Sequence, residues 1–356
     1  MKFIHTGDVH WGVIPDCDKP WGLERAQAVK DTFGRIIQLA KQEEVDFLFI
    51  TGDLFHSQPL EQDLKDLNHL FSSIPGTRVA IIAGSFDRVT GSSALHSFTW
   101  APNVTYFLDE APTGVYFPEI NTEVHGFSYH SSEITDPVLD DVKAPFDGRI
   151  HILLAYAGDD LHVPIQTESL SDSGFTYIAL GSRHKYELLK NRAIAYCGSP
   201  EPLGKAELGE HGVVLGQIHP RSFAVTALDF IPMAKLAYVP FAVHISPQTT
   251  NKELLDTVMG SVKARGLQNI YRLRITGLRR SDTTFNLQPI MSNLRIVDVI
   301  DETEPQYDFS ELVREHPDDV IGYYIQKFQK PDASPIEKKA LYYGIHALLQ
   351  TIEERR

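Results

Sequence analysis

MKFIHTGDVHW, at residues 1–11, decides the expected fold, because a short apolar strand runs directly into a glycine followed by Asp8 and His10. The same arrangement returns as GDLFH at residues 52–56, GSFD at 84–87 and GSRH at 181–184. Each glycine allows the backbone to turn sharply where a strand ends. Because the carboxyl ends of parallel strands meet at one edge of a sheet, we expect these loops to converge into a functional site.

The sequence around these loops alternates between strand-like and helix-like segments. Apolar strands are expected at residues 2–6, 46–50 and 78–83, and helical periodicity is present at residues 23–41 and 64–71. Such alternation is typical of a parallel or mixed sheet that is covered by helices. The first part of the chain is therefore predicted to be an α/β fold.

Beyond residue 104 the segments become shorter and predict a second, antiparallel layer. The expected strands lie at residues 116–117, 122–127, 149–154 and 177–181, followed by a hairpin of residues 212–218 and 222–230. This hairpin is expected to turn at Pro220, and the first domain should end near Pro240.

The remaining sequence predicts a small α+β domain. It contains a strand at residues 242–245, a helix whose start is marked by a capping box of Thr250 and Glu253, and a strand at residues 271–275. Beyond Asp301 the chain becomes acidic and is expected to be helical.

The last helix is expected to begin at Ser334, Pro335 and Glu337, a strong helix-start signal. Its apolar stripe could pack on its own domain or dock on a partner protein. The stripe consists of Leu341, Ile345, Leu348 and Ile352.

The charge of the chain limits how it could bind nucleic acid. With a formal net charge of −14 over 356 residues, the surface is not one that coats nucleic acid nonspecifically. If DNA is the ligand, local basic patches must hold it, although either candidate group could also be a solvated face. The candidates are Arg272, Arg274, Arg279 and Arg280 in one group, and Lys185, Lys190 and Arg192 in the other.

Other sequence features narrow the class of protein. The two cysteines, Cys17 and Cys197, form no CxxC pair, so any metal must be held by histidine and carboxylate. No run approaches the roughly 18 continuous apolar residues of a spanning helix, so we expect a cytoplasmic protein without a membrane span. A dinucleotide-binding GxGxxG loop and a P-loop are also absent.

Four stretches of the chain occur together, in the same order, in one known family. They are MKFIHTGDVHW at residues 1–11, GDLFH at 52–56, YIALG at 177–181 and GSPEPLG at 198–204. In these motifs the chain resembles the SbcD-type DNA repair exonucleases, which are calcineurin-like metallophosphoesterases. The resemblance covers residues 1 to about 230 and, more faintly, the domain that follows.

The resemblance implies a four-layer sandwich of two mixed β-sheets flanked by helices. This metallophosphoesterase domain would occupy residues 1–240, with an α+β capping domain at 241–300 and a helical C-terminal tail at 301–356 as a candidate partner-binding region. It also implies a coiled-coil ABC ATPase of the SbcC type as partner and DNA as substrate. Whether a homodimer forms is left open.

The family's metal ligands can be carried over position by position. One ion would be held by Asp8, His10, Asp53 and His184, which are all present. The second ion would share Asp53, but its three private ligands are replaced. The replacements are Ser85, Tyr156 and Ser182, where the family has Asn, His and His.

The catalytic position of the family is also changed. Phe86 stands where the family has the histidine that protonates the leaving group, and Asp87 has lost that usual partner. Arg88 and Arg183 could pair with Asp87, and Arg183 could supply the charge of the missing ion. Asp159, Asp160 and His162 could provide a displaced ligand.

We therefore expect one divalent transition metal, Mn²⁺, Fe²⁺ or Zn²⁺, an empty second site, and weak or lost hydrolysis. An active one-metal phosphoesterase and a non-catalytic architectural subunit remain as alternatives. Five other histidines are expected to be hydrogen-bonded structural residues. They are His5, His56, His96, His125 and His151.

Overall fold

The computed structural model describes residues 1–190 and 193–353, with the side chains of 352 and 353 excepted. Arg192 of the second basic group and the side chain of Ile352 in the apolar stripe therefore lie outside the described part of the chain. The chain divides into two compact units. The first contains Met1–Val239 and Arg265–Arg272, and the second contains Pro240–Ala264 and Leu273–Arg356.

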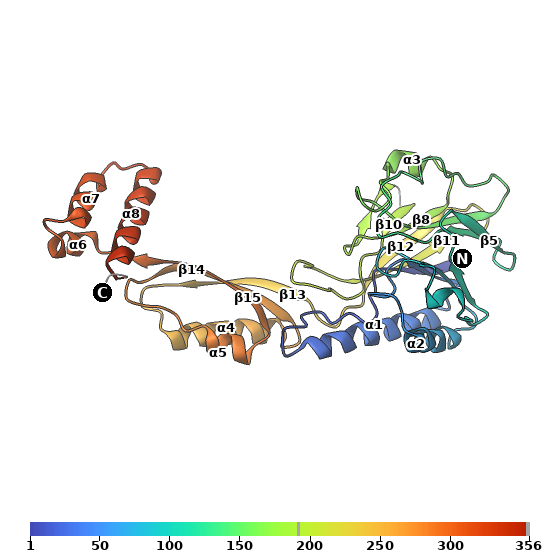
Figure 1. Cartoon of the computed structure of the whole chain (residues 1–356), viewed down its shortest axis with the longest axis horizontal. Helices are drawn as coiled ribbons and strands as arrows, with labels where there is room; N and C mark the ends of the chain where they lie inside the picture. The colour runs from blue at the N-terminus through green and yellow to red at the C-terminus, as the bar shows by residue number, and fades with distance from the viewer. Residues whose placement is uncertain (191–192, 354–356) are drawn as a thin grey trace. The chain divides into compact units, whose positions relative to one another are not determined.

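The first unit contains two six-stranded mixed sheets (Figure 1). In the first sheet four neighbouring strands are parallel, and the late hairpin adds two antiparallel strands at one edge. In spatial order its strands are β12 (Val225–Pro232), β11 (Gly212–Ile218), β1 (Lys2–Thr6), β2 (Phe47–Thr51), β3 (Arg78–Ile82) and β4 (Val104–Phe107).

The second sheet corrects the expectation of an antiparallel layer. Its four central strands run parallel, and only the two edge strands are antiparallel to their neighbours. In spatial order its strands are β5 (Thr113–Phe117), β6 (Thr122–Gly126), β7 (Ile150–Tyr156), β8 (Tyr177–Gly181), β10 (Ile194–Tyr196) and β9 (Glu187–Leu188). Every residue of β7 and β8 is buried, as is typical of parallel strands covered on both faces.

Two apolar cores hold these layers together. One lies between the sheets and joins side chains such as Phe3 and Phe49 to Leu154 and Leu180. The other lies between the first sheet and the helices α1 (Gly22–Gln42) and α2 (Glu61–Ser72), which match the predicted helices closely. The short helices η1 (Ala94–His96) and α3 (Thr167–Ser171) complete this unit. The predicted fold of two mixed sheets flanked by helices is confirmed.

The second unit is built on a third sheet of β13 (Tyr238–Ile245), β14 (Ile270–Arg280) and β15 (Ile296–Gln306), with helices α4 (Asn251–Arg265) and α5 (Gln288–Asn293). The predicted capping box is present at the start of α4, where the Glu253 N–H donates to Thr250 Oγ1 and the Thr250 N–H donates to Glu253 Oε2. The expected helical start at residue 301 is wrong. Residues 301–306 instead continue β15, where sheet pairing overrides the acidic composition.

The tail consists of α6 (Phe309–Glu315), α7 (Val320–Phe328) and α8 (Pro335–Glu353). The stripe on α8 does not face outward. Leu341 and Ile345 form a buried cluster with Ile321 and Ile325 of α7, and Leu348 packs against it. Of the two alternatives for this stripe, the structure shows packing within the chain for Leu341, Ile345 and Leu348, because α7 covers them.

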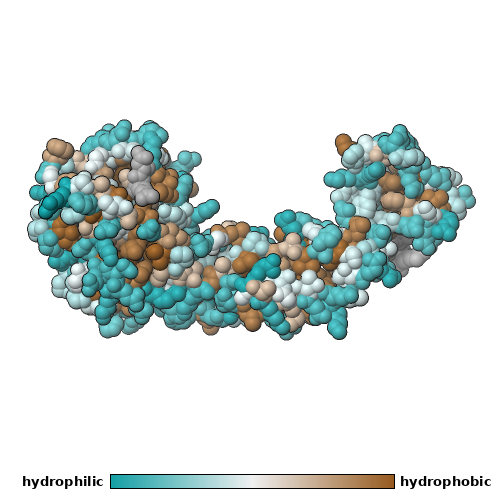
Figure 2. All heavy atoms as spheres, turned by 180° about the vertical axis from the view of Figure 1, so that it is seen from behind, coloured by the Kyte–Doolittle hydropathy of each residue, from teal (hydrophilic) through white to brown (hydrophobic). Residues whose placement is uncertain are grey.

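In the described part of the chain, no helix has both the length and the apolar content needed to cross a membrane. Figure 2 shows apolar patches distributed over a mainly hydrophilic face of the molecule.

Candidate metal centre

The loops that follow β1 and β2 are joined by backbone hydrogen bonds. The Asp8 N–H donates to Gly52 O at 3.0 Å, and the His10 N–H donates to Asp53 O at 2.9 Å. These bonds fix two of the predicted motifs against each other at the carboxyl ends of adjacent parallel strands, as expected from the sequence.

The same loops hold side chains on an unusual backbone. Asp8, His10 and Asp53 all have positive φ, at 49°, 51° and 46°. Left-handed conformations of this kind cost residues other than glycine free energy, and they cluster at functional sites. Gly84 allows a further close approach, since a Cβ there would lie 2.5 Å from Asp53 Oδ1.

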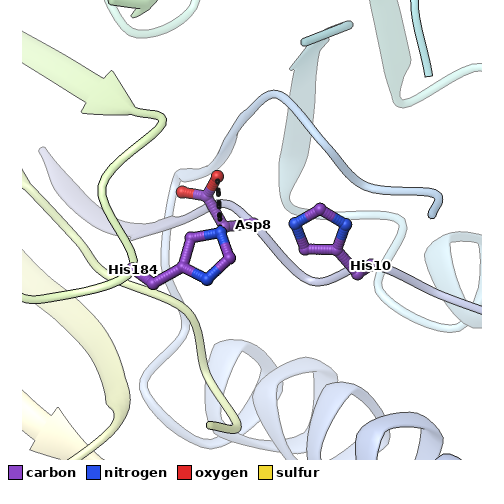
Figure 3. Close-up of side chains that lie close together, drawn as sticks. All are labelled: Asp8, His10 and His184. Carbon is purple, nitrogen blue, oxygen red and sulfur yellow. Dashed lines mark ion pairs between the residues drawn. The ribbon is translucent and has the colours of Figure 1, made fainter. Parts of the chain in front are cut away.

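Three of the four predicted ligands come together (Figure 3). Ligand atoms of Asp8, His10 and His184 all lie within 4.8 Å of one another. His184 Nε2 is 3.8 Å from Asp8 Oδ1, and the rings of His10 and His184 are 5.2 Å apart. The arrangement gathers one carboxylate and two imidazoles at one point.

His10 supplies the observation that tests whether a metal fits here. Its Nε2 is buried and has no hydrogen-bond partner among the described residues, while its Nδ1 lies 3.3 Å from His56 Nδ1. Burial, assisted by the nearby His184 and His56, lowers the pKa of His10 to about 3. A neutral imidazole with an unpartnered buried nitrogen is suited to a transition metal such as Zn²⁺, Mn²⁺ or Fe²⁺.

Asp8 is a fully buried carboxylate that needs compensating charge. Burial raises its pKa to about 7, although the neighbouring His184 acts in the opposite direction. The Ser182 N–H lies 3.3 and 3.2 Å from the two oxygens of Asp8. A cation at this position would favour the ionised form of Asp8.

His184 is oriented by Glu207, a residue that the sequence reasoning missed. His184 Nδ1 lies 2.9 Å from Glu207 Oε1, so the proton on Nδ1 donates to the carboxylate and Nε2 points toward Asp8. Burial alone would lower the pKa of His184, but Glu207 and Asp8 together raise it to about 9. A carboxylate behind a histidine ligand is a recurrent feature of metal sites.

Asp53 lies next to the cluster, but its carboxylate oxygens accept hydrogen bonds from other residues. Its Oδ2 lies 3.8 Å from His10 Nε2, and it also accepts the hydroxyl of Tyr156 at 2.7 Å. Its Oδ1 accepts the Phe86 N–H at 2.8 Å. Burial raises the pKa of Asp53, partly offset by these two donors.

Three of the four substituted positions lie around Asp53, whereas Ser182 contacts Asp8. Ser85 Oγ lies 3.2 Å from the Tyr156 hydroxyl. Phe86 is 47% exposed, stacks on His56 at 5.2 Å and meets the His10 ring edge-on at 5.0 Å. Tyr156, Ser85 and Phe86 thus stand beside Asp53.

The two arginines do not pair with Asp87, so that expectation is wrong. The oxygens of Asp87 accept the N–H groups of Gly84 and Phe55, at 2.7 and 3.2 Å. Arg183 donates instead to Glu187 and to Gly158 O, and Arg88 donates to Ser85 O. Backbone amides have taken the place of charged partners, and burial raises the pKa of Asp87 to about 8.

The remaining predicted residues have local partners. Asp159 and His162 pair with each other at 2.8 Å, outside the three-residue group. The five histidines expected to be structural are each within hydrogen-bonding distance of a polar group. The contacts are His5 with Tyr177 and Thr51, His56 with His10, His96 with Thr90 O, and His125 with His151.

The basic groups are partly neutralised by nearby acids. Arg280 pairs with Asp282 at 2.7 Å, Arg274 lies 3.7 Å from Glu302, and Lys190 pairs with Glu168 at 3.1 Å. Such pairing weakens each group as an attractant for phosphate.

Comparisons with known proteins agree with the fold. The profile of the calcineurin-like phosphoesterases matches residues 1–203. The uncharacterized metallophosphoesterase YhaO of Bacillus subtilis is 27% identical over 241 residues, covering 60% of this chain and 57% of YhaO. The DNA double-strand break repair protein Mre11 of Sulfurisphaera tokodaii is 27% identical over 226 residues, covering 58% and 56%.

A solved structure, TT1561 of Thermus thermophilus, is 10% identical to this chain with a TM-score of 0.37, covering 63% of this chain and 96% of TT1561. The alignments to YhaO and Mre11 span little more than half the length of those relatives. The profile match, however, takes in more than half of this chain, including the motif loops with Asp8, His10 and His184. The chain belongs to the calcineurin-like phosphoesterase family.

Proposed function

We propose that this chain is an SbcD-like subunit that works on DNA with a coiled-coil ABC ATPase of the SbcC type, and that its hydrolytic activity is weak or lost. The motif resemblance and the relatives named for DNA double-strand break repair support the DNA substrate. The observation that carries the loss of activity is the 2.7 Å bond from the Tyr156 hydroxyl to Asp53 Oδ2.

This bond matters because Asp53 is the position expected to bridge two ions. A neutral hydroxyl occupies Oδ2, and Ser85 Oγ lies 3.2 Å behind it. Neither side chain offers the nitrogen or carbonyl oxygen that the family uses there. The second half of the centre is therefore closed by a hydrogen bond instead of being open to a cation.

The first half retains what one ion requires. An ion held by Asp8, His10 and His184 would activate a water and withdraw charge from a phosphate group. Glu207 keeps His184 Nε2 directed at the centre, and Asp53 remains beside His10. Phe86 has no proton to donate to a leaving group, and the loss of a general acid alone typically costs about 10²- to 10⁴-fold in rate.

The proposal is tested by rebuilding the missing groups. We expect the combined change Ser85→Asn, Phe86→His, Tyr156→His and Ser182→His to add a second Mn²⁺ equivalent and to raise cleavage of linear DNA by about 10²-fold or more. The same variant with Asp8→Asn is the control and should be inactive. Robust cleavage by the wild-type chain that Asp8→Ala abolishes would show that the inferred impairment is wrong.

The partnership has its own test. The full chain should co-purify with an SbcC-type ATPase when the two are expressed together. Separate elution of the two proteins at micromolar concentration would contradict this part of the proposal and leave the reasoning on the metal centre unaffected.

A second candidate is an active one-metal phosphoesterase on a nucleotide or another small phosphoester. The intact grouping of Asp8, His10 and His184 favours it. A turnover about 10³-fold or more above background on a generic phosphodiester would support this candidate over the first.

A further inference from the structure

A second cluster of metal-ligating side chains lies on a different part of the second sheet. Glu123 and His125 are two residues apart on β6, so they share one face, and His151 on β7 pairs in register with Glu123. One ligand atom from each lies within 4.8 Å of the other two. His151 precedes Tyr156 by five residues, so the cluster is about 16 Å along the strand from the Asp53 side of the first centre.

The distances are close to those of a tetrahedral site. His125 Nε2 lies 3.1 Å from His151 Nδ1 and 3.9 Å from Glu123 Oε1. Ligands about 2.0–2.1 Å from a tetrahedral Zn²⁺ are about 3.3–3.4 Å from one another. The His125–His151 distance is close to this value and the His125–Glu123 distance exceeds it by about 0.5 Å, so side-chain movements within this group could place all three donors around one ion.

Neighbouring side chains orient the ligand atoms of this cluster. His151 Nε2 lies 2.9 Å from Asp147 Oδ1, which fixes the proton on Nε2 and leaves the Nδ1 lone pair facing the cluster. Arg149 holds Glu123 Oε2 at 2.8 Å, so Oε1 remains on the side of His125. Burial lowers the pKa of His125, which keeps this imidazole neutral.

The neighbouring strand leaves room for this arrangement. Gly114 on β5 pairs in register with His125. A Cβ at Gly114 would come within 2.6 Å of Glu123 Oε1 and 3.1 Å of the His125 ring. The side chains of His125 and Glu123 are 14% and 17% exposed, so the cluster is mostly desolvated and still reachable from solvent.

We propose that Glu123, His125 and His151 form a second metal site, separate from the first centre, that binds one Zn²⁺ and ties β6 to β7. Two imidazoles and one carboxylate suit Zn²⁺ better than Mg²⁺ or Ca²⁺, which prefer oxygen ligands. A water would complete the tetrahedron. On binding, the proton that His125 Nε2 shares with His151 moves to His125 Nδ1, and no redox change is involved.

The test separates this site from the first centre. The full chain carrying Asp8→Asn and His184→Gln is stripped of metal with a chelator and titrated with ZnCl₂. We expect one remaining equivalent of Zn²⁺ per chain, which disappears when His125→Gln is added. His96→Gln, a change of the same kind at an exposed histidine outside both clusters, should retain it.

Co²⁺ in place of Zn²⁺ gives a second measurement on the folded parent. Visible absorption bands of a tetrahedral Co²⁺ complex should appear in the Asp8→Asn, His184→Gln chain. Asp147→Asn should weaken Co²⁺ binding by about 10- to 100-fold, because it removes the carboxylate behind His151. A parent without Zn²⁺ binding and without these bands, or binding that His125→Gln leaves unchanged, would overturn the proposal.

Discussion

Tyr156→Phe removes the hydroxyl that occupies Asp53 Oδ2 and leaves the ring in place. The lost bond is a 2.7 Å contact from a buried donor to a carboxylate that is 0% exposed. A hydrogen bond to a charged group is worth roughly 1.5–3 kcal/mol. A loss of about 2 kcal/mol in a unit of this size lowers the melting temperature of the metal-free protein by roughly 4–8 °C.

The effect of Mn²⁺ on the melting temperature of Tyr156→Phe shows whether the lost hydrogen bond to Asp53 causes the destabilisation. The variant frees Asp53 Oδ2 for a cation, so excess Mn²⁺ should narrow the gap in melting temperature between variant and wild type. Tyr196→Phe is the matched control, because its buried hydroxyl donates to the neutral Ala157 O at 3.0 Å. That control should cost about 1 kcal/mol, with no dependence on Mn²⁺.

The assay is thermal unfolding, followed by near-UV circular dichroism with chelator or with Mn²⁺. A variant as stable as wild type in chelator would show that the hydroxyl does not hold Asp53. An equal gap with and without Mn²⁺ would show that the hydroxyl does not exclude a cation.

Three further predictions concern pH and packing. Because the pKa of His184 is raised to about 9, protonated His184 stabilises the metal-free fold fully below pH 6.5. This stabilisation is lost as the pH rises through about 9, and the change in unfolding free energy is no more than roughly 3 kcal/mol. Glu207→Gln should flatten this slope in urea denaturation across that range, and an unchanged slope would contradict the pairing. Ile345→Ala should destabilise the tail by about 2–5 kcal/mol, and amide exchange in α7 and α8 should become faster. Tyr343 is 55% exposed, so Tyr343→Ala should have little effect. Arg25→Met leaves the buried Glu201 without the guanidinium that lies 3.3 Å from it, and should lower the free energy of unfolding by about 3–5 kcal/mol. Urea denaturation measures this loss, and a loss below about 1 kcal/mol would contradict the role of the pair.

The centre could be predicted where it depends on strand ends. Asp8 and His184 are 176 residues apart, yet each follows a buried parallel strand directly, so their meeting follows from sheet topology. Their assignment as candidate ligands came from the motif resemblance, and the unpartnered buried nitrogen of His10 supports this assignment independently.

The contact between Glu207 and His184 could not be predicted from the sequence. Glu207 lies in a loop 23 residues after His184, and no spacing rule connects the two residues. The hydrogen bond from the Tyr156 hydroxyl to Asp53 could not be predicted either. The sequence shows that a histidine ligand is replaced by tyrosine, but not which contact the tyrosine makes. The strand at residues 301–306 was missed because acidic residues are poor strand formers in isolation, and only pairing with a neighbouring strand stabilises them there.

The left-handed backbone at Asp8, His10 and Asp53 has a consequence for how this chain would change under selection for stability alone. Each of these residues costs about 1 kcal/mol or more in that conformation, whereas glycine adopts it freely. Three such positions amount to a substantial share of the roughly 5–15 kcal/mol that holds a domain folded. Glycine at any one of them would remove this backbone cost, but it would also remove a side chain that could hold a cation. Relief of backbone strain alone would favour glycine at these positions, and this chain still has charged or metal-ligating side chains at all three.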